Sequence, residues 1–127
     1  MIHAVIVEDE KPILDLMKVI IGRNPRFTIT GAFTNPLEAL ERIPELRPDV
    51  AFLDVDMPKM NGHELARRIN KLSEQTKIVF TTAYKQYELE AFEVDAMDYI
   101  LKPVTPAMIE RVMLCLDELP PLCDQVG

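Results

Sequence analysis

Five short apolar runs alternate with five amphipathic segments along this chain of 127 residues, and this alternation constrains the fold more than any other feature. Strands that alternate with helices form right-handed β–α–β units, and therefore a parallel sheet with helices on both faces. We predict an α/β fold, a doubly wound five-stranded parallel sheet with strand order 2-1-3-4-5. The predicted strands span about residues 3–8, 27–32, 49–54, 77–82 and 96–101.

The helices are predicted from their first residues and their apolar spacing. Pro12 and Pro36 each fit the first turn of a helix, and Asn35 fits the position that caps it. A fourth helix, at about 86–94, has a weak apolar face, which we interpret as the mark of a moving part. The apolar stripes expected to face the sheet include Leu37, Leu40 and Ile43 in the second helix and Leu65, Ala66, Ile69 and Leu72 in the third.

Acidic residues follow two of the predicted strands. Glu8 and Asp9 end the first strand, Asp54 ends the third, and Asp56 lies two residues further on. The predicted strand order makes these two strands neighbours, so their carboxylates meet at the carboxyl edge of the sheet, where ligands bind in open α/β folds. Carboxylates so close together repel one another unless a hard cation lies among them. We therefore expect the functional site at this edge.

Polar motifs after four of the strands carry a family resemblance. They are Glu8-Asp9, Asp54 with Met57-Pro58 and Gly62, Thr82-Ala83, and Lys102-Pro103, in this chain order. Together they resemble the receiver domain of bacterial two-component response regulators, which has the flavodoxin-like fold. The resemblance covers residues 2–118, and residues 119–127 read as a tail or the start of an interdomain linker.

The resemblance implies a role for each site residue. Asp54 would accept a phosphoryl group, and Mg²⁺ would be held by Glu8, Asp9, Asp54 and the backbone carbonyl of Asp56. Thr82 and Lys102 would contact phosphoryl oxygens, and the Lys102-Pro103 bond is often cis in the family. Thr82 and Tyr99 would act as the switch, changing the surface formed by helix 4, strand 5 and helix 5. Tyr84 would restrict attack by water. Such a domain catalyses only its own phosphorylation and dephosphorylation.

The resemblance also implies partners. A sensor histidine kinase or a phosphotransfer protein would dock near Lys11, Pro12, Leu14 and Pro103-Val104. The run from Thr82 to Pro103 looks like the LytTR-linked subgroup, whose members carry a separate DNA-binding output domain. Phosphorylation could drive a homodimer through the helix 4, strand 5 and helix 5 surface. A single-domain regulator that acts by protein contact is the alternative.

Composition limits the other classes of function. The net charge of −7 argues against direct binding of nucleic acid, which needs a basic face. We expect no secretory signal and no membrane partner, a cytoplasmic location, and reduced thiols at Cys115 and Cys123 rather than a disulfide.

Two alternatives stay open. Asp54-Val55-Asp56 superficially fits the Asp-x-Asp signature of Mg²⁺-dependent phosphohydrolases of the haloacid dehalogenase type. Its position in mid-chain and the lack of a role for Glu8 and Asp9 oppose this reading. A receiver-like fold that never takes phosphate is the other alternative, opposed by the complete set of site residues.

Overall fold

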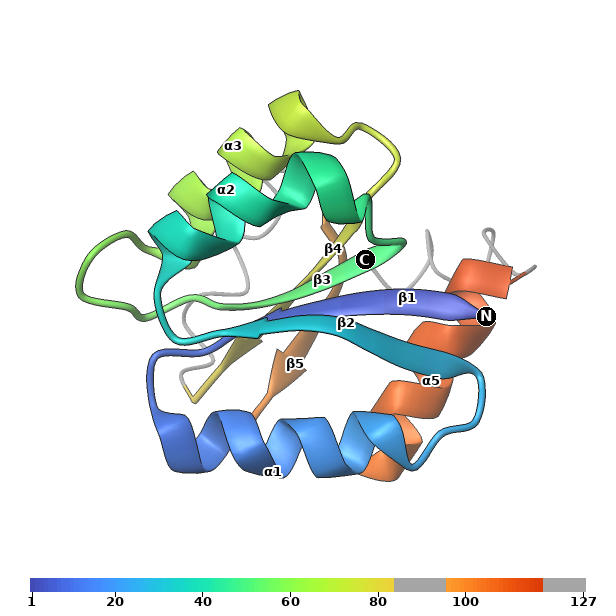
Figure 1. The fold of residues 1–127 in the computed structure, drawn as a ribbon. Helices are drawn as coiled ribbons and strands as arrows, with labels where there is room; N and C mark the ends of the chain where they lie inside the picture. Colours follow the sequence, from blue (N-terminus) through green and yellow to red (C-terminus); the bar gives the residue numbers. More distant parts are fainter. Residues whose placement is uncertain (84–95, 118–127) are drawn as a thin grey trace.

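The computed structural model describes residues 1–83 and 96–117, and these form a parallel sheet between two layers of helices (Figure 1). The predicted strand order is confirmed, because the sheet runs β2-β1-β3-β4-β5 and every strand pair is parallel. The prediction that the second strand lies at an edge is also confirmed. The strands are β1 (Ile2–Val7), β2 (Phe27–Phe33), β3 (Val50–Asp54), β4 (Lys77–Thr82) and β5 (Ala96–Leu101).

Two buried clusters, one on each face of the sheet, form the core. One cluster joins the sheet to α1 and α5, and the other joins it to α2 and α3. Strands buried on both faces explain why the sequence shows near-continuous apolar runs there rather than alternation. The helices are α1 (Lys11–Gly22), α2 (Pro36–Leu46), α3 (Gly62–Leu72) and α5 (Pro106–Asp117).

Polar caps fix where α2 and α3 begin, and therefore how the loops before them are anchored at the carboxyl edge. The Asn35 side chain accepts a hydrogen bond from Leu37 N at 2.9 Å, as its position predicted. Asn61 accepts from Glu64 N at the start of α3, also at 2.9 Å. Among the described residues, no helix is long and apolar enough to cross a membrane.

Strand register brings the predicted acidic residues together. Val7 pairs with Leu53, so that Glu8 and Asp54 come next to each other at the ends of β1 and β3. Asp54 in turn pairs with Thr81, and Thr82 pairs with Leu101. The ends of four strands therefore meet at one edge of the sheet.

Three expectations from the sequence were wrong. Leu37 and Leu72 are each 48% exposed, and Ala39 fills the α2 layer instead. Both leucines lie outside the buried face of their helix, which holds Pro36, Ala39 and Ile43 in α2 and Leu65, Ala66 and Ile69 in α3. Cys115 is disulfide-bonded in the structure, whereas the sequence argument rested on redox compartment and had no geometry to use. The predicted fourth helix, Tyr84, Cys123 and the tail lie outside the described residues.

Candidate functional site

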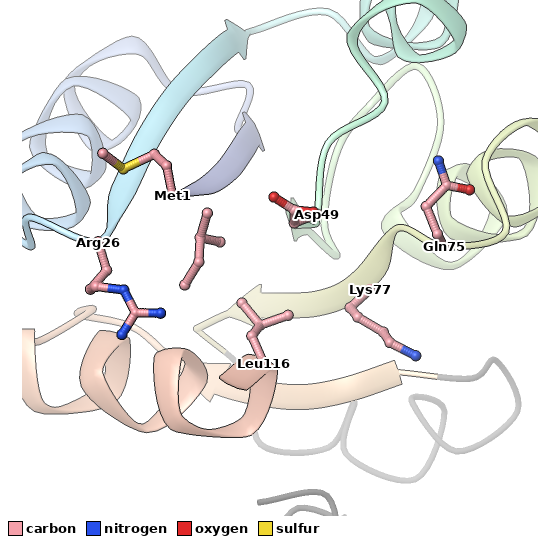
Figure 2. Close-up of a pocket in the computed structure, with 7 residues that line it drawn as sticks. Met1, Arg26, Asp49, Gln75, Lys77 and Leu116 are labelled. Carbon is pink, nitrogen blue, oxygen red and sulfur yellow. The ribbon is translucent and has the colours of Figure 1, made fainter. Parts of the chain in front are cut away.

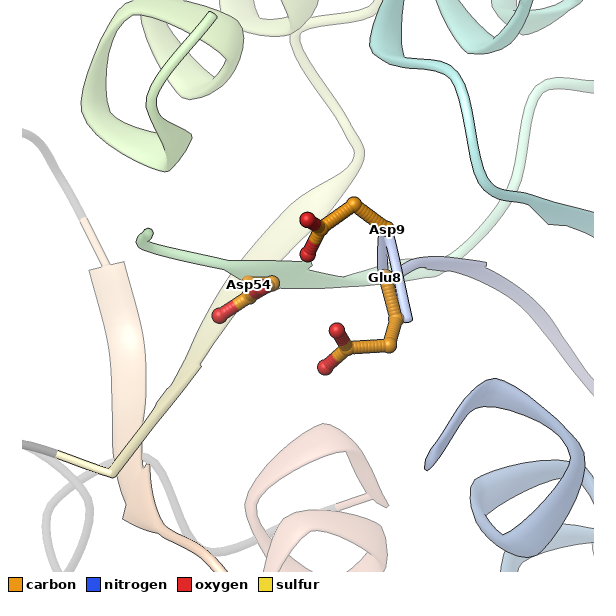
Figure 3. A group of neighbouring side chains, drawn as sticks. All are labelled: Glu8, Asp9 and Asp54. Carbon is orange, nitrogen blue, oxygen red and sulfur yellow. The ribbon is translucent and has the colours of Figure 1, made fainter. Parts of the chain in front are cut away.

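Three carboxyl groups converge at the carboxyl edge of the sheet. Glu8, Asp9 and Asp54 each offer one oxygen, and these oxygens all lie within 4.8 Å of one another. Figure 3 shows the carboxyl groups of Glu8 and Asp9 on either side of that of Asp54. Glu8 is fully buried and Asp54 is 3% exposed, whereas Asp9 is only partly buried. The grouping predicted from the sequence is confirmed.

Lys102 supplies the positive charge of the site. It follows β5, its backbone N–H donates to Thr82 O at 2.7 Å, and its peptide bond to Pro103 is cis, as the resemblance implied. The Lys102 ammonium donates to Glu8 Oε1 and, at 3.2 Å, to Asp54 Oδ1. One cation therefore bridges two buried carboxylates that would otherwise repel each other.

Asp54 occupies an environment that favours its neutral form. Burial raises the pKa of its carboxyl group, Lys102 opposes this rise, and the Glu8 charge and a hydrogen bond with Asp9 add to it. The resulting pKa is about 7, against an ordinary value of 3.8. A cation that offsets the neighbouring negative charge would therefore favour the ionised carboxylate of Asp54, which is the form that can act as a nucleophile.

The donor set fits a hard divalent cation. All three candidate side-chain ligands are carboxylate oxygens, which Mg²⁺ prefers, and Mg²⁺ commonly keeps several waters and needs few protein ligands. Burial raises the pKa of the Asp54 carboxyl most, and the nearby Glu8 charge adds to this rise, so a further cation beside Asp54 would favour its ionised form. Glu8, Asp9 and Asp54 could hold Mg²⁺ together. Asp56 lies beside them, with its N–H donating to Asp54 Oδ1 at 3.3 Å, and its carbonyl as a ligand stays a prediction.

The first residue of α3 packs directly on the backbone that carries Asp54. Gly62 N donates to Val55 O at 2.9 Å, and a Cβ at Gly62 would lie 2.6 Å from Asp54 O. Only a residue without a side chain fits this approach, because backbone atoms on both sides cannot move independently.

We therefore expect Gly62→Ala to lower the free energy of unfolding by about 1–3 kcal/mol, since the Ala methyl group forces the β3–α3 backbones apart. Urea unfolding followed by circular dichroism measures this. Gly22→Ala is the matched control, because the nearest atom to its new Cβ is 3.9 Å away, and it should unfold close to wild type. Equal stability of Gly62→Ala and Gly22→Ala would contradict the packing argument.

Comparison with known proteins shows the family of the chain. The family description "Response regulator receiver domain" matches residues 4–113 of the chain. The chain belongs to the response regulator receiver domain family. The receiver domain is 43% identical over 113 residues to the sensory transduction protein LytT of Bacillus cereus, which covers 89% of this chain and 46% of that protein. LytT of Bacillus subtilis is 39% identical over 114 residues. These relatives are consistent with the LytTR-linked subgroup, and the chain spans about half of their length.

Solved receiver structures have the same fold. The response regulatory domain of MrkE from Klebsiella pneumoniae is 33% identical, with a TM-score of 0.76 and coverage of 97% of this chain and 98% of that chain. A DNA-binding response regulator of the LuxR family from Staphylococcus aureus is 28% identical, with a TM-score of 0.84 and coverage of 92% and 100%. The predicted flavodoxin-like receiver fold is therefore confirmed.

The two predicted switch residues lie on neighbouring strands of the receiver domain. Thr82 is the last residue of β4 and is buried. Tyr99 on β5 is half-buried and packs against the core on the α2 and α3 face. Motion of either residue stays a prediction.

The predicted docking residues are only partly accessible. Lys11, Pro12 and Pro103 are exposed, but Leu14 and Val104 are buried in the core beside α1 and α5. Their apolar side chains fit the core as well as a partner surface, which is why the sequence alone did not separate the two uses.

The opposite end of the sheet holds a different cavity (Figure 2). Its volume is about 380 Å³, and Arg26, Asp49 and Lys77 line it together with apolar side chains. Asp49 is the one acidic residue among the described residues that line it, and Asp49 Oδ2 accepts a hydrogen bond from His3 N. This cavity lacks the carboxylate grouping of the opposite edge, which remains the candidate site.

Sequence reasoning missed two buried polar groups of the sheet. Asp98 on β5 is buried and receives two hydrogen bonds from Arg111 on α5, at 2.8 and 3.0 Å. Thr81 is fully buried beside Asp54. The first feature pairs residues thirteen apart on different elements, for which the sequence has no periodic signal. The second could have been found from strand pairing, because Thr81 directly follows the apolar run Ile78 to Phe80 in a strand predicted to lie between two others.

Proposed function

We propose that this receiver domain accepts a phosphoryl group on Asp54 and so switches a surface that controls an output. The observation that carries the proposal is the Lys102 ammonium bridging Glu8 and Asp54 at the rim of the carboxylate cluster. A cation on the acceptor carboxylate is what an incoming anionic group requires, and a compact ammonium suits a phosphoryl oxygen.

The chemical step is a displacement at phosphorus. One Asp54 oxygen forms a bond to phosphorus while the bond to the leaving group breaks, and the leaving group departs with the electron pair. The donor is a phosphohistidine, or acetyl phosphate in the test below. Lys102 offsets the charge of the entering group, and the Thr82 hydroxyl donates to one of its oxygens. The domain acts only on itself and is not otherwise an enzyme.

Glu8, Asp9 and Asp54 would hold Mg²⁺, with the carbonyl of Asp56 as a further ligand. When bound, Mg²⁺ neutralises carboxylate and phosphoryl charge and orients the transfer. Asp9, the most accessible of the three carboxylates, lies on the side that faces solvent. Glu8 is buried and also accepts a hydrogen bond from Glu10 N at 3.1 Å, so its orientation is fixed by its own loop.

Phosphorylation would then shift the packing of the receiver domain. The new group adds charge and strong acceptors beside Thr82, which lies one strand from Asp54, and Tyr99 lies on the next strand. Thr82 moving toward the group would leave room into which Tyr99 turns. The surface formed by helix 4, β5 and α5 changes as a result, which is a population shift between two packings.

Partners and output follow from the family. We propose that the receiver domain lies in the cytoplasm and that a sensor histidine kinase or a phosphotransfer protein is its phosphoryl donor. We propose transcription as the output, through a separate DNA-binding domain that is not in this sequence. Two findings support this proposal: the chain matches about half of the length of the LytT relatives, and one similar solved structure is that of a DNA-binding response regulator. Phosphorylation could also drive a homodimer, and a single-domain regulator that acts by protein contact is the alternative. The family match argues against a phosphohydrolase of the haloacid dehalogenase type, because the receiver domain description covers most of the chain.

Intact-mass spectrometry after incubation with acetyl phosphate and Mg²⁺ tests the proposal. We expect one phosphoryl group per chain, its loss when a chelator replaces Mg²⁺, and no adduct in Asp54→Asn. The same adduct in Asp54→Asn would place the acceptor elsewhere. No adduct on wild type with any phosphodonor would refute the proposed function, and steady hydrolysis of phosphate esters would favour an enzyme.

A further inference from the structure

A buried hydroxyl beside Asp54 has no hydrogen-bond partner among the residues that the structure describes. Thr81 is fully buried, and its Oγ1 makes no hydrogen bond to any part of the chain that the structure describes. Buried hydroxyls almost always pair, since leaving one unpaired forfeits its hydration without compensation. Ser73 and Thr76 illustrate the ordinary case, because their hydroxyls contact each other at 2.7 Å and Thr76 also donates to Pro48 O. Thr81 therefore calls for a specific explanation.

The register of the sheet places the Thr81 side chain on the same face as the ionic cluster. Residues two apart along a strand point to the same face, and directly paired residues of parallel strands do so too. Val79, Phe52 and Ile100 all belong to the core cluster on the α1 and α5 face. Thr81 follows Val79 by two residues and pairs with both Asp54 and Ile100, so its hydroxyl faces the α1 and α5 side at the level of Asp54.

The Lys102 side chain reaches across β4 to its two partners, Glu8 and Asp54. It follows β5, whereas Asp54 ends β3 and Glu8 follows β1, and β4 lies between β5 and β3. On this face, β4 presents Thr81 at the level of Asp54. The Lys102 side chain therefore passes over Thr81 on its way to the two carboxylates.

An ammonium group has three N–H donors, and two of those of Lys102 go to Glu8 Oε1 and Asp54 Oδ1. A hydroxyl oxygen is an acceptor of suitable size for the third. This hydroxyl acceptor becomes more important whenever one of the two carboxylates binds another cation or is modified. The buried Lys102 ammonium then loses one of its acceptors. Thr81, on the strand between Lys102 and Asp54, is placed to supply this acceptor.

We propose that Thr81 is a positioning residue, whose buried hydroxyl accepts a hydrogen bond from the Lys102 ammonium when that ammonium gives up a carboxylate, and so holds it over Asp54 during phosphoryl transfer. This inference rests on the proposed function of Asp54 as phosphoacceptor. It adds a further residue to the site, adjacent in sequence to Thr82 but facing the opposite side of the sheet.

A stability cycle tests the contact without Mg²⁺ and without phosphorylation. Thr81→Val keeps the shape and removes the hydroxyl, and in otherwise wild-type protein we expect its urea midpoint to be equal or higher, since an unpaired hydroxyl is lost. In a Glu8→Met background, Lys102 has lost one carboxylate and relies on Thr81. There the same Thr81→Val change should lower the urea midpoint. A merely structural threonine predicts the same shift in both backgrounds, and that result would overturn the inference.

The rate of phosphorylation gives the second readout. At saturating Mg²⁺ and acetyl phosphate, we expect Thr81→Val to react about tenfold more slowly than wild type, as loss of one hydrogen bond to a charged group would produce. Thr81→Ser keeps the hydroxyl and should restore the rate. Thr30→Val is the matched control, because its hydroxyl donates to Ala4 O on β1, away from the site, and it should react like wild type.

The outcomes separate the two proposals. If wild type is phosphorylated and Thr81→Val reacts at the same rate, the inference on Thr81 fails and the proposed function stands. If wild type takes no phosphoryl group, both fail. Should Thr81→Val not fold, Thr81→Ala compared with Thr81→Ser repeats both measurements, and equal rates in that pair would overturn the inference.

Discussion

Replacement of Asp54 by asparagine is expected to make the receiver domain more stable at pH 8, by about 2–4 kcal/mol, while abolishing its phosphorylation. The carboxyl group is buried next to Glu8, and its pKa is raised to about 7 in the folded protein from an ordinary 3.8. Each pH unit of that rise corresponds to ~1.4 kcal/mol of preference for the protonated form. An asparagine side chain removes the charge and keeps the shape.

The sign of the pH dependence follows from proton binding. Between about pH 4 and pH 7 the folded state holds a proton on Asp54 that the unfolded chain has released, so the stability of wild type falls as pH rises through this window. Below the window both states are protonated and above it both are ionised. Asp54→Asn should therefore gain most above pH 7 and little at pH 4.

Urea unfolding followed by circular dichroism measures this, since the chain has no tryptophan for fluorescence. Addition of Mg²⁺ at about a hundred times its dissociation constant should stabilise wild type by ~2.7 kcal/mol and the asparagine variant less. Asp49→Asn is the matched control, because Asp49 lies at the opposite end of the sheet. Identical pH profiles for wild type and Asp54→Asn would contradict the raised pKa of the Asp54 carboxyl.

The sequence alone predicted how the site is assembled but not how its charges pair. The strand order placed Glu8 beside Asp54, because neighbouring parallel strands end at one edge, and the structure confirms this. The partner of Glu8 was not predictable in the same way. Lys102 reaches it across β3 and β4, and such a contact depends on side-chain length and on the direction in which the chain leaves β5.

Burial was predictable in the middle of elements and less so at their ends. The apolar stripe of α3 is correct for Leu65 and Ile69, yet Leu72 is exposed while Ser73 beside it is buried, because a periodic pattern does not fix where the edge of the buried face lies. Thr81 shows the converse. A hydroxyl in a β-branched residue suits an edge or a core strand equally, so only the pairing of β4 with β3 and β5 reveals that it is buried beside Asp54.

Lys102→Met is expected to destabilise the protein by about 3–5 kcal/mol and to slow phosphorylation by about two orders of magnitude. The methionine fills much of the same space. It leaves the fully buried Glu8 with the hydrogen bond from Glu10 N as its one partner in the described part of the chain. An unpaired buried carboxylate is among the costliest defects a fold can contain, and it must either draw in water or take up a proton.

A second substitution separates the structural loss from the chemical one. Glu8→Gln combined with Lys102→Met removes the unpaired charge, so the double variant should recover most of the lost stability, as measured by urea unfolding. It should not recover phosphorylation, because the cation over Asp54 is still missing. Lys11→Met serves as the control, since Lys11 pairs with Asp15 on the exposed surface of α1 and should change stability by less than about 1 kcal/mol.

The Glu8 substitution also tests why Lys102 and the buried Glu8 occur together. If Glu8 only held Lys102 in place, Glu8→Gln alone would leave phosphorylation nearly intact, because a glutamine oxygen still accepts from the ammonium. If Glu8 also helps to hold the divalent cation, Glu8→Gln should weaken the response to Mg²⁺ while Lys102 keeps its contact with Asp54. A Glu8→Gln variant with the Mg²⁺ dependence of wild type would assign Glu8 to the lysine alone, and the cation to Asp9 and Asp54.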